Sequence, residues 1–248
     1  MLKRKIYSDL VEWKRTKRNE CLLVKGARQV GKSFIIEQFG KDNYDSVIVI
    51  NFYQHPEFGN IFEGDLTPNE IYKRMSLQIP NIKFIEGNTL IFLDEIQHCP
   101  NARTAIKFLA QDNRYDVISS GSLLGLHYKD IVSIPVGYER QLEMYSLDFE
   151  EFLWAYGYSE ETIADLKCYF ISREKLPESV LKKFNGILRE YLVVGGMPDV
   201  VNTFFETNNF QAVYNRQKAI LAEYEEDIKK YAKEQERQGI YPGTIRLS

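Results

Sequence analysis

This sequence has little of what marks secreted, metal-binding or membrane-spanning proteins. It holds 3 cysteines, Cys21, Cys99 and Cys168, and their wide spacing forms neither a disulfide framework nor a pattern of metal ligands. No apolar run approaches the about 20 residues needed to cross a bilayer. The basic residues 1–5 are not followed by the apolar stretch of a secretory signal. We therefore expect a protein of the reducing cytoplasm without a membrane span.

Charge of one sign is not in excess either. The 32 lysine and arginine residues nearly balance 35 aspartate and glutamate residues, and the formal net charge is −3. The totals therefore do not demand a nucleic-acid partner. Hydrophobic residues make up 44% of the chain and aromatic residues 13%, which excludes a disordered protein and suffices for a buried core.

Short apolar runs and helical patterns alternate over residues 1–147. Ile6, Leu10 and Trp13 fall at helical spacing and predict an amphipathic helix over residues 5–18. Such alternation is typical of a parallel sheet with helices on both faces, so we expect an α/β fold. The expected strands are 21–25, 47–52, 89–93, 115–119 and 141–147, and the other expected helices are 32–39 (stopped by Gly40), Pro68 to before Pro80, and 102–110.

After Ser146 the pattern is helical throughout. The expected helices cover 148–156, 160–171, 179–194, 198–206 and 210–238. We therefore divide the chain into a core over 1–147, a helical region over 148–235 and an irregular tail over 236–248.

The helix expected over 5–18 lies in a basic stretch. Its charges could touch nucleic acid or an acidic lipid surface. We favour the alternative that they form a solvated face over a packed apolar stripe. The basic residues are Lys3, Arg4, Lys5, Lys14, Arg15, Lys17 and Arg18.

The decisive pattern is Gly26-Ala27-Arg28-Gln29-Val30-Gly31-Lys32-Ser33, which fits G-x-x-x-x-G-K-[ST] at every fixed position. Gly26 and Gly31 allow backbone conformations closed to residues with a Cβ, so the loop can turn its N–H groups onto phosphate. Lys32 supplies a cation to the β- and γ-phosphates, and Ser33 offers a hydroxyl to Mg²⁺. A buried strand precedes the loop and a helix follows it, which is the context this motif requires.

An acidic pair supplies the second half of the expected site. The apolar strand Leu90–Leu93 ends in Asp94 and Glu95. Asp94 would hold Mg²⁺ through water, and Glu95 would orient and polarise an attacking water. The strand expected over 47–52 intervenes between the two motifs in sequence, which suits ATPases with an extra strand between the motif-bearing strands.

Two polar residues are weaker candidates for contact with the γ-phosphate or its attacking water. Ser120 follows the strand expected over 115–119 and could sense the γ-phosphate; the alternative is a turn-rich loop over Ser119–Ser122. Gln97 follows the acidic pair and could help to place water. Phe34 directly follows the phosphate-binding loop and is counted with it as a nucleotide-binding residue.

Four further residues receive structural interpretations. His98 and Cys99 lie before Pro100 without a second ligand at metal-binding spacing, so we interpret them as structural. Arg103 and Arg140 could each act as a charge-neutralising finger on the γ-phosphate. We favour a surface position for both arginines.

At these residues a family resemblance becomes specific. The segments Gly26–Ser33, Phe92–Gln97, Ser120–Ser122, Ser146–Leu153 and Gly195–Asp199 resemble bacterial and archaeal AAA-type ATPases that carry a C-terminal nuclease-like domain of unknown role. The resemblance covers roughly residues 5–235. It implies an AAA-type P-loop core, followed after residue 147 by a helical lid.

The chain departs from this family in two places, and one segment that resembles it has a simpler interpretation. Family members usually run longer, so we expect this chain to be truncated before or within the nuclease-like domain. The family often has a Gly-Arg pair before its last core strand, and Pro135–Arg140 differs from it, which leaves the finger unassigned. The glycines of Gly195–Pro198 can simply join two helices.

The expected activity is ATP binding and Mg²⁺-dependent hydrolysis, with Lys32 and Glu95 as catalytic residues, coupled to a conformational change. One alternative is a nucleotide-dependent switch or interaction module with little turnover. Transfer of phosphate to a small molecule is less expected, because the Asp94–Glu95 pair suits water activation. GTP is also less expected, because no Asn-Lys-x-Asp segment occurs. A protein partner, self-association or nucleic acid stay open.

Overall fold

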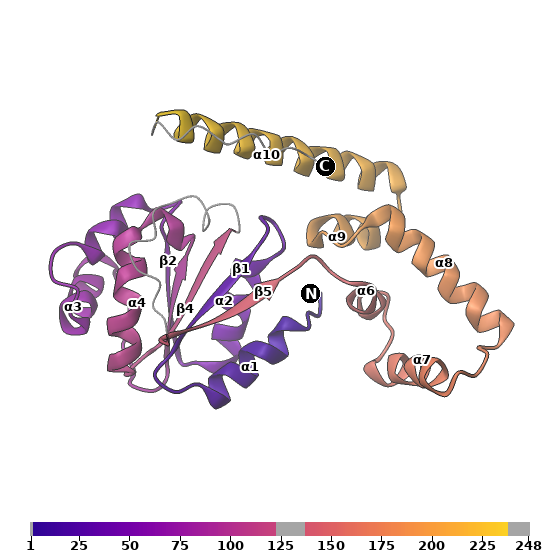
Figure 1. Ribbon diagram of the computed structural model, residues 1–248, viewed down its shortest axis with the longest axis horizontal. Helices are drawn as coiled ribbons and strands as arrows, with labels where there is room; N and C mark the ends of the chain where they lie inside the picture. Colours follow the sequence, from indigo (N-terminus) through magenta and orange to yellow (C-terminus); the bar gives the residue numbers. More distant parts are fainter. Residues whose placement is uncertain (1, 123–136, 238–248) are drawn as a thin grey trace. The chain divides into compact units, whose positions relative to one another are not determined.

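The computed structural model describes residues 2–122 and 137–237 (Figure 1). The chain divides into two compact units, one over residues 3–151 and one from Phe152 onward. The sequence analysis places its boundary after Leu147. Of the tail expected over 236–248, residues 238–248 lie outside the described part, and residues 236 and 237 belong to the last helix rather than to an irregular segment.

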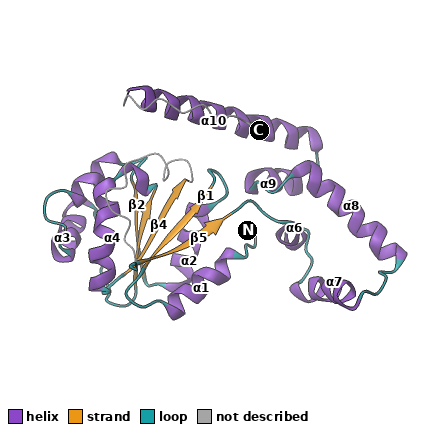
Figure 2. Ribbon diagram, viewed as in Figure 1, coloured by secondary structure: helices purple, strands orange, loops and turns teal. Residues whose placement is uncertain are grey.

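The first unit is built on a sheet of five parallel strands (Figure 2). Their order across the sheet is β2-β3-β4-β1-β5, which confirms the expected α/β class. The strands are β1 (Cys21–Gly26), β2 (Ser46–Asn51), β3 (Thr89–Asp94), β4 (Asp116–Ser122) and β5 (Glu139–Met144).

The strand order brings the two motif-bearing strands close without making them neighbours. β1 leads into the glycine-rich loop and β3 ends at Asp94, and β4 pairs with both of them. The strand that intervenes in sequence, β2, lies instead at the edge of the sheet beside β3. The carboxyl end of β4 therefore lies between the carboxyl ends of β1 and β3, where the two motifs are found.

Helices cover both faces of this sheet (Figure 1). Because strand side chains alternate between faces, Cys21 and Leu23 pack into the core beneath α3 and α4, whereas Leu22 and Val24 point the other way. The helical elements are α1 (Ile6–Thr16), α2 (Lys32–Asn43), η1 (Pro56–Phe62), α3 (Pro68–Gln78), η2 (Ile96–His98) and α4 (Pro100–Asp112).

Gly40 does not end the helix that follows the loop. The expectation of a stop there is wrong, because α2 continues to Asn43. A Cβ at position 40 would lie 3.0 Å from Leu90 Cδ2 and 3.0 Å from Val47 Cγ2. The glycine thus permits close packing of α2 on β2 and β3, which outweighs the poor helix propensity of glycine.

Two strands differ at their ends from the sequence-based expectation. β4 extends through Ser122, so the alternative of a turn-rich loop over Ser119–Ser122 is wrong. β5 ends at Met144 rather than at Leu147. Its only neighbour among the described strands, β1, ends at Gly26, which pairs with Met144, and the next carbonyl, that of Tyr145, accepts from the Arg4 side chain.

The second unit is helical, as expected. α6 (Phe149–Ala155) passes from the first unit into it, and its helices are α7 (Glu160–Ser172), α8 (Glu178–Val194), α9 (Pro198–Thr207) and α10 (Phe210–Arg237). Phe152 centres an aromatic cluster, with ring centroids 5.3 Å from Tyr191 and 5.4 Å from Phe205. Within the described residues, no helix is long and apolar enough to span a membrane.

Candidate nucleotide-binding site

The glycine-rich loop joins the end of β1 to the start of α2. Gly26 is the last residue of β1, and a Cβ there would overlap the Met144 carbonyl oxygen on the neighbouring strand. Gln29 and Gly31 both adopt the left-handed backbone region, with φ of 62° and 93°. The loop therefore depends on glycine at its ends, where the motif predicts it.

Lys32 folds back over this loop. Its Nζ donates to the carbonyl oxygens of Gly26 at 3.0 Å and Ala27 at 2.7 Å. Burial lowers the pKa of the Lys32 ammonium below its ordinary value, and the negative charges of Glu95 and Asp94 act in the opposite direction. Lys32 is also the first residue of α2, so an anion bound near its ammonium would meet the N-terminus of that helix as well.

The Asp94 carboxylate receives hydrogen bonds from four donors, which lie on α2, β2 and β4 and directly after β3. Its Oδ2 accepts from the hydroxyl of Ser33 at 2.9 Å and from the amide of Asn51 at 2.8 Å. Its Oδ1 accepts from the hydroxyl of Ser120 and from the backbone N–H of Glu95 at 3.1 Å. Asp94 is only 3% exposed, so these donors hold a buried carboxylate in a fixed orientation.

Asn51 is a site residue that the sequence analysis missed. It ends β2, and the register pairs it with Asp94 on β3. The only signal in the sequence is a polar residue that closes the apolar run Val47–Ile50, which by itself does not show which strand lies beside β2.

The Glu95 side chain, unlike its backbone N–H, forms its hydrogen bond with a residue other than Asp94. Its backbone is left-handed, with φ of 54°, and its Oε2 accepts a hydrogen bond from the Gln97 amide. The Gln97 Oε1 is buried and has no hydrogen-bond partner among the described residues. Phe34, included in the expected site, lies on the exposed side of α2 with 60% of its surface accessible.

The two arginines considered as fingers form ion pairs near the amino-terminal ends of β1 and β5, whereas the loop follows the carboxyl end of β1. Arg103 is 7% exposed and forms a bidentate pair with Glu139, so its expected surface position is wrong. Glu139 pairs with Cys21, the first residue of β1, whereas the loop follows the last. Arg140, next along β5, forms an ion pair with Glu20 at 2.5 Å.

The stretch before β5 that departs from the family pattern is only partly described, since Pro135 and Val136 lie outside the described residues. His98 and Cys99 form part of the packing after β3. The His98 ring lies 5.4 Å from that of Tyr53, and Cys99 is buried beside α4.

The residues present fit ATP with Mg²⁺, the cofactors that the motif implies. Gln29 and Gly31 have left-handed φ values, which are typical of loops whose backbone N–H groups bind anions, and Lys32 adds a positive charge. Ser33 and Asp94 place a hydroxyl and a carboxylate oxygen 2.9 Å apart, which are oxygen ligands that Mg²⁺ prefers. The described residues contain no cluster of three or more histidine, cysteine, aspartate or glutamate side chains that could hold a metal ion.

The chain matches the AAA domain family over residues 18–153, more than half of its 248 residues. It belongs to that family. Residues 185–240 match a domain of unknown function, and the nuclease-like domain of the resemblance stays a prediction. No curated protein sequence matches this AAA-family chain.

One solved structure shows a similar fold. The Walker-type ATPase PABY2304 of Pyrococcus abyssi is 18% identical, with a TM-score of 0.53, and the match covers 94% of this chain and 77% of that one. At this identity the likeness establishes the fold alone. The structure of Caenorhabditis elegans PCH-2 is 12% identical over 86% of this chain and 65% of that one, and its TM-score of 0.44 is too low to support an argument.

Proposed function

We propose that this protein binds ATP with Mg²⁺ and hydrolyses the bond between the β- and γ-phosphates. The observation that carries the proposal is the cluster in which Ser33 of the loop and Ser120 of β4 both bond to Asp94. In it the glycine-rich loop and the acidic pair, which lie far apart in sequence, meet at one edge of the sheet.

Each of these residues has a definite part in the proposed reaction. Lys32 moves from the loop carbonyls to the phosphate oxygens, where it balances negative charge. Ser33 and Asp94 would hold Mg²⁺, Asp94 through water, and the ion would neutralise charge on the phosphates. Ser120 lies on β4, the strand between β1 and β3, and from there it would contact both the γ-phosphate and Asp94.

Glu95 acts as the general base. It accepts a proton from a water molecule as that water attacks the γ-phosphorus, and the bridging oxygen leaves with ADP. Its Oε2 accepts a hydrogen bond from the Gln97 amide, so Gln97 would orient the carboxylate of the base.

A nucleotide-dependent switch with little turnover is the second candidate. It is favoured by the engagement of Arg103 and Arg140 in ion pairs far from the loop, which leaves neither as a finger within the chain. A finger from a protein partner or a second copy would then be needed for fast turnover. In both cases we propose that nucleotide changes the conformation of the helical unit.

The other proposed properties follow from the same expectations. We propose a cytoplasmic protein, and nucleic acid is the alternative partner for the basic segment around α1. Several basic residues of that segment are already engaged: Lys14 lies over the Tyr44 ring at 3.7 Å from its centroid, and Lys17 forms an ion pair with Asp116 at 2.6 Å. These two ammonium groups already have partners within the protein, so less of their charge is available to bind nucleic acid.

Steady-state hydrolysis and equilibrium binding of Mg·ATP test the proposal. We expect wild type to release phosphate over many turnovers, Lys32→Ala to lose binding by about 10- to 100-fold, and Glu95→Gln to bind ATP but lose turnover by about 100-fold or more. Tight binding by wild type without turnover would favour the switch. Absence of binding by an intact, folded chain would overturn both.

A further inference from the structure

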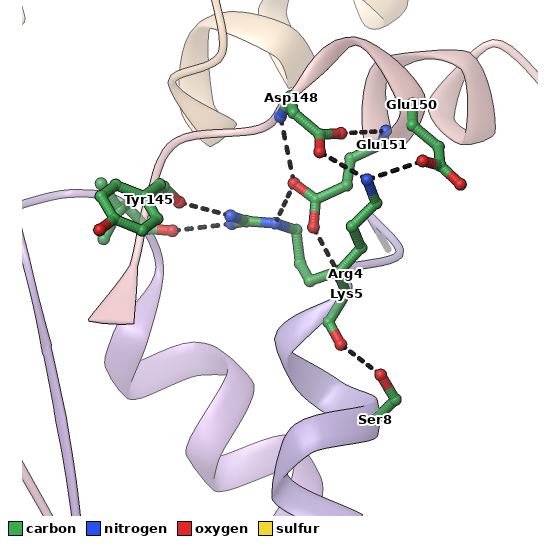
Figure 3. Close-up of polar contacts among 8 residues, drawn as sticks. Arg4, Lys5, Ser8, Tyr145, Asp148, Glu150 and Glu151 are labelled. Carbon is green, nitrogen blue, oxygen red and sulfur yellow. Dashed lines mark hydrogen bonds and ion pairs between the residues drawn. The ribbon is translucent and has the colours of Figure 1, made fainter. Parts of the chain in front are cut away.

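Arg4 is a buried arginine that connects the glycine-rich loop to the end of β5 (Figure 3). It is only 7% exposed. Its Nη1 donates to the Val30 carbonyl at 2.9 Å, inside the loop, and its Nη2 donates to the Tyr145 carbonyl at 2.6 Å. Its Nε lies 3.2 Å from Glu151 Oε2. One guanidinium thus contacts two backbone segments and one carboxylate.

The contact with Val30 fixes a peptide group that the phosphate site uses. The described backbone contains no cis peptide bond, so the Val30–Gly31 peptide is trans and its C=O and N–H point in opposite directions. When Arg4 holds the Val30 carbonyl from behind, the Gly31 N–H points to the other side. That N–H belongs to the set that a loop of this kind turns towards phosphate.

Glu151 in turn holds Arg4 in place. Its side chain is 5% exposed in the first turn of α6 and also accepts from the backbone N–H of Lys5 at 2.6 Å. Asp148 and Glu151 form a reciprocal cap: the Glu151 N–H donates to Asp148 Oδ1 at 2.9 Å, and the Asp148 N–H donates to Glu151 Oε2 at 3.3 Å. The carboxylate that faces Arg4 therefore has little freedom to move.

We propose that Arg4 is a positioning residue for nucleotide binding, which presets the Gly31 N–H through the Val30 carbonyl and depends on Glu151 for its own orientation. The inference rests on the proposed function, since it concerns the same loop. It also gives a part to the segment Ser146–Leu153, which the proposed chemistry leaves without one. A planar, always charged guanidinium suits acceptors in three directions, whereas a lysine ammonium does not.

The test compares Mg·ATP and Mg·ADP affinity with stability in four single variants of the full chain. Arg4→Met removes the guanidinium, and Arg4→Lys keeps the charge for the case in which Arg4→Met fails to fold. Glu151→Gln keeps an acceptor but removes the charge. Lys5→Ala is the matched control, because its Nζ forms ion pairs with Asp148 and Glu150 at 2.6 and 2.7 Å in the same segment.

We expect both Arg4 variants to bind Mg·ATP about 10-fold more weakly or worse, measured well below their unfolding temperature. Glu151→Gln should weaken binding in the same direction, and the Arg4→Lys, Glu151→Gln double variant should lose less than the sum of the two single effects. Lys5→Ala should bind within about twofold of wild type, because exposed ion pairs contribute little.

The outcomes separate this inference from the function on which it rests. If wild type binds Mg·ATP and the Arg4 variants bind it equally well while their unfolding temperatures fall, Arg4 is a structural tie and the inference is wrong. If Lys5→Ala weakens binding as much as Arg4→Lys, the effect belongs to the whole segment and the inference is also wrong. If wild type binds no nucleotide, the proposed function fails first.

Discussion

The Ser33 hydroxyl lies 2.9 Å from Asp94 Oδ2, although the two residues are 61 positions apart in the chain. This contact joins the loop that would cradle phosphate to the strand that would hold the metal. Both oxygens would help to hold Mg²⁺, Asp94 through water, so the ion would lie beside this hydrogen bond. The behaviour of the site on metal binding can therefore be predicted from residues around Asp94.

Asp94→Asn should separate nucleotide binding from metal-dependent turnover. The amide keeps the shape of the side chain but removes the charge that attracts Mg²⁺. We expect turnover to fall by at least about 100-fold, and chelation of Mg²⁺ with EDTA to abolish wild-type turnover in the same way. Phosphate release measured across a Mg²⁺ titration checks this. Wild-type turnover that persisted in EDTA would contradict the assigned role.

Ser120→Ala should reduce kcat by more than a loss of packing alone would explain. The variant removes a hydroxyl that bonds to the Asp94 carboxylate, and we expect about a 10-fold loss of kcat. Ser119→Ala is the matched control, since Ser119 is equally buried but bonds to the Leu22 carbonyl at 3.3 Å. Its kcat should stay within about twofold of wild type. Equal losses in both variants would show that only the packing of β4 matters.

Gly26→Ala should destabilise the first unit as well as the loop. The new Cβ would overlap the Met144 carbonyl, which belongs to the backbone and cannot rotate away. We expect the free energy of unfolding in urea to fall by about 1–3 kcal/mol, with loss of Mg·ATP binding. Gly59→Ala is the control, because its Cβ would meet no atom within 4 Å. An unchanged midpoint for Gly26→Ala would contradict the packing argument.

Nucleotide affinity should fall at alkaline pH through Lys32. Burial lowers the pKa of this ammonium in the nucleotide-free protein, and bound phosphates would raise it again. Binding therefore takes up a proton at a pH above the free-state pKa, and affinity declines as pH rises through that value. The dissociation constant of Mg·ADP measured between about pH 7 and 10 gives the slope. Lys32→Arg, whose charge is permanent, should show a flatter profile.

Much of the site could be predicted because its residues lie together in two short stretches of the sequence. Lys32 and Ser33 follow a fixed pattern of glycines, and Asp94 and Glu95 end an apolar run, so each follows from a short stretch of sequence. The structure brings Ser120 to Asp94 because β4 happens to lie beside β3. A sequence pattern alone cannot supply that neighbour, which is why a loop over the same residues was an equal alternative.

The residues that were missed depend on contacts between distant segments. Asn51 reaches Asp94 only through the pairing of β2 with β3, and Arg4 reaches Val30 and Tyr145 across 26 and 141 positions. Arg103 was assigned to the surface because nothing near it in sequence shows Glu139. Gly40 was interpreted as a helix end because glycine has two uses, and only the packing of Leu90 and Val47 distinguishes them.

The position of β1 between β4 and β5 has a consequence for folding during synthesis. Its two neighbours are β4 and β5, and the register pairs Gly26 with Ser122 and with Met144. A ribosome that adds about 5–20 residues per second needs roughly 6–24 s to pass from one partner of the Gly26–Met144 pair to the other. During that time the apolar strand Cys21–Val24 lacks its neighbour β5, and until Ser122 has been added it lacks β4 as well. Slower translation or loss of chaperones should therefore favour aggregation of nascent chains that end before β5.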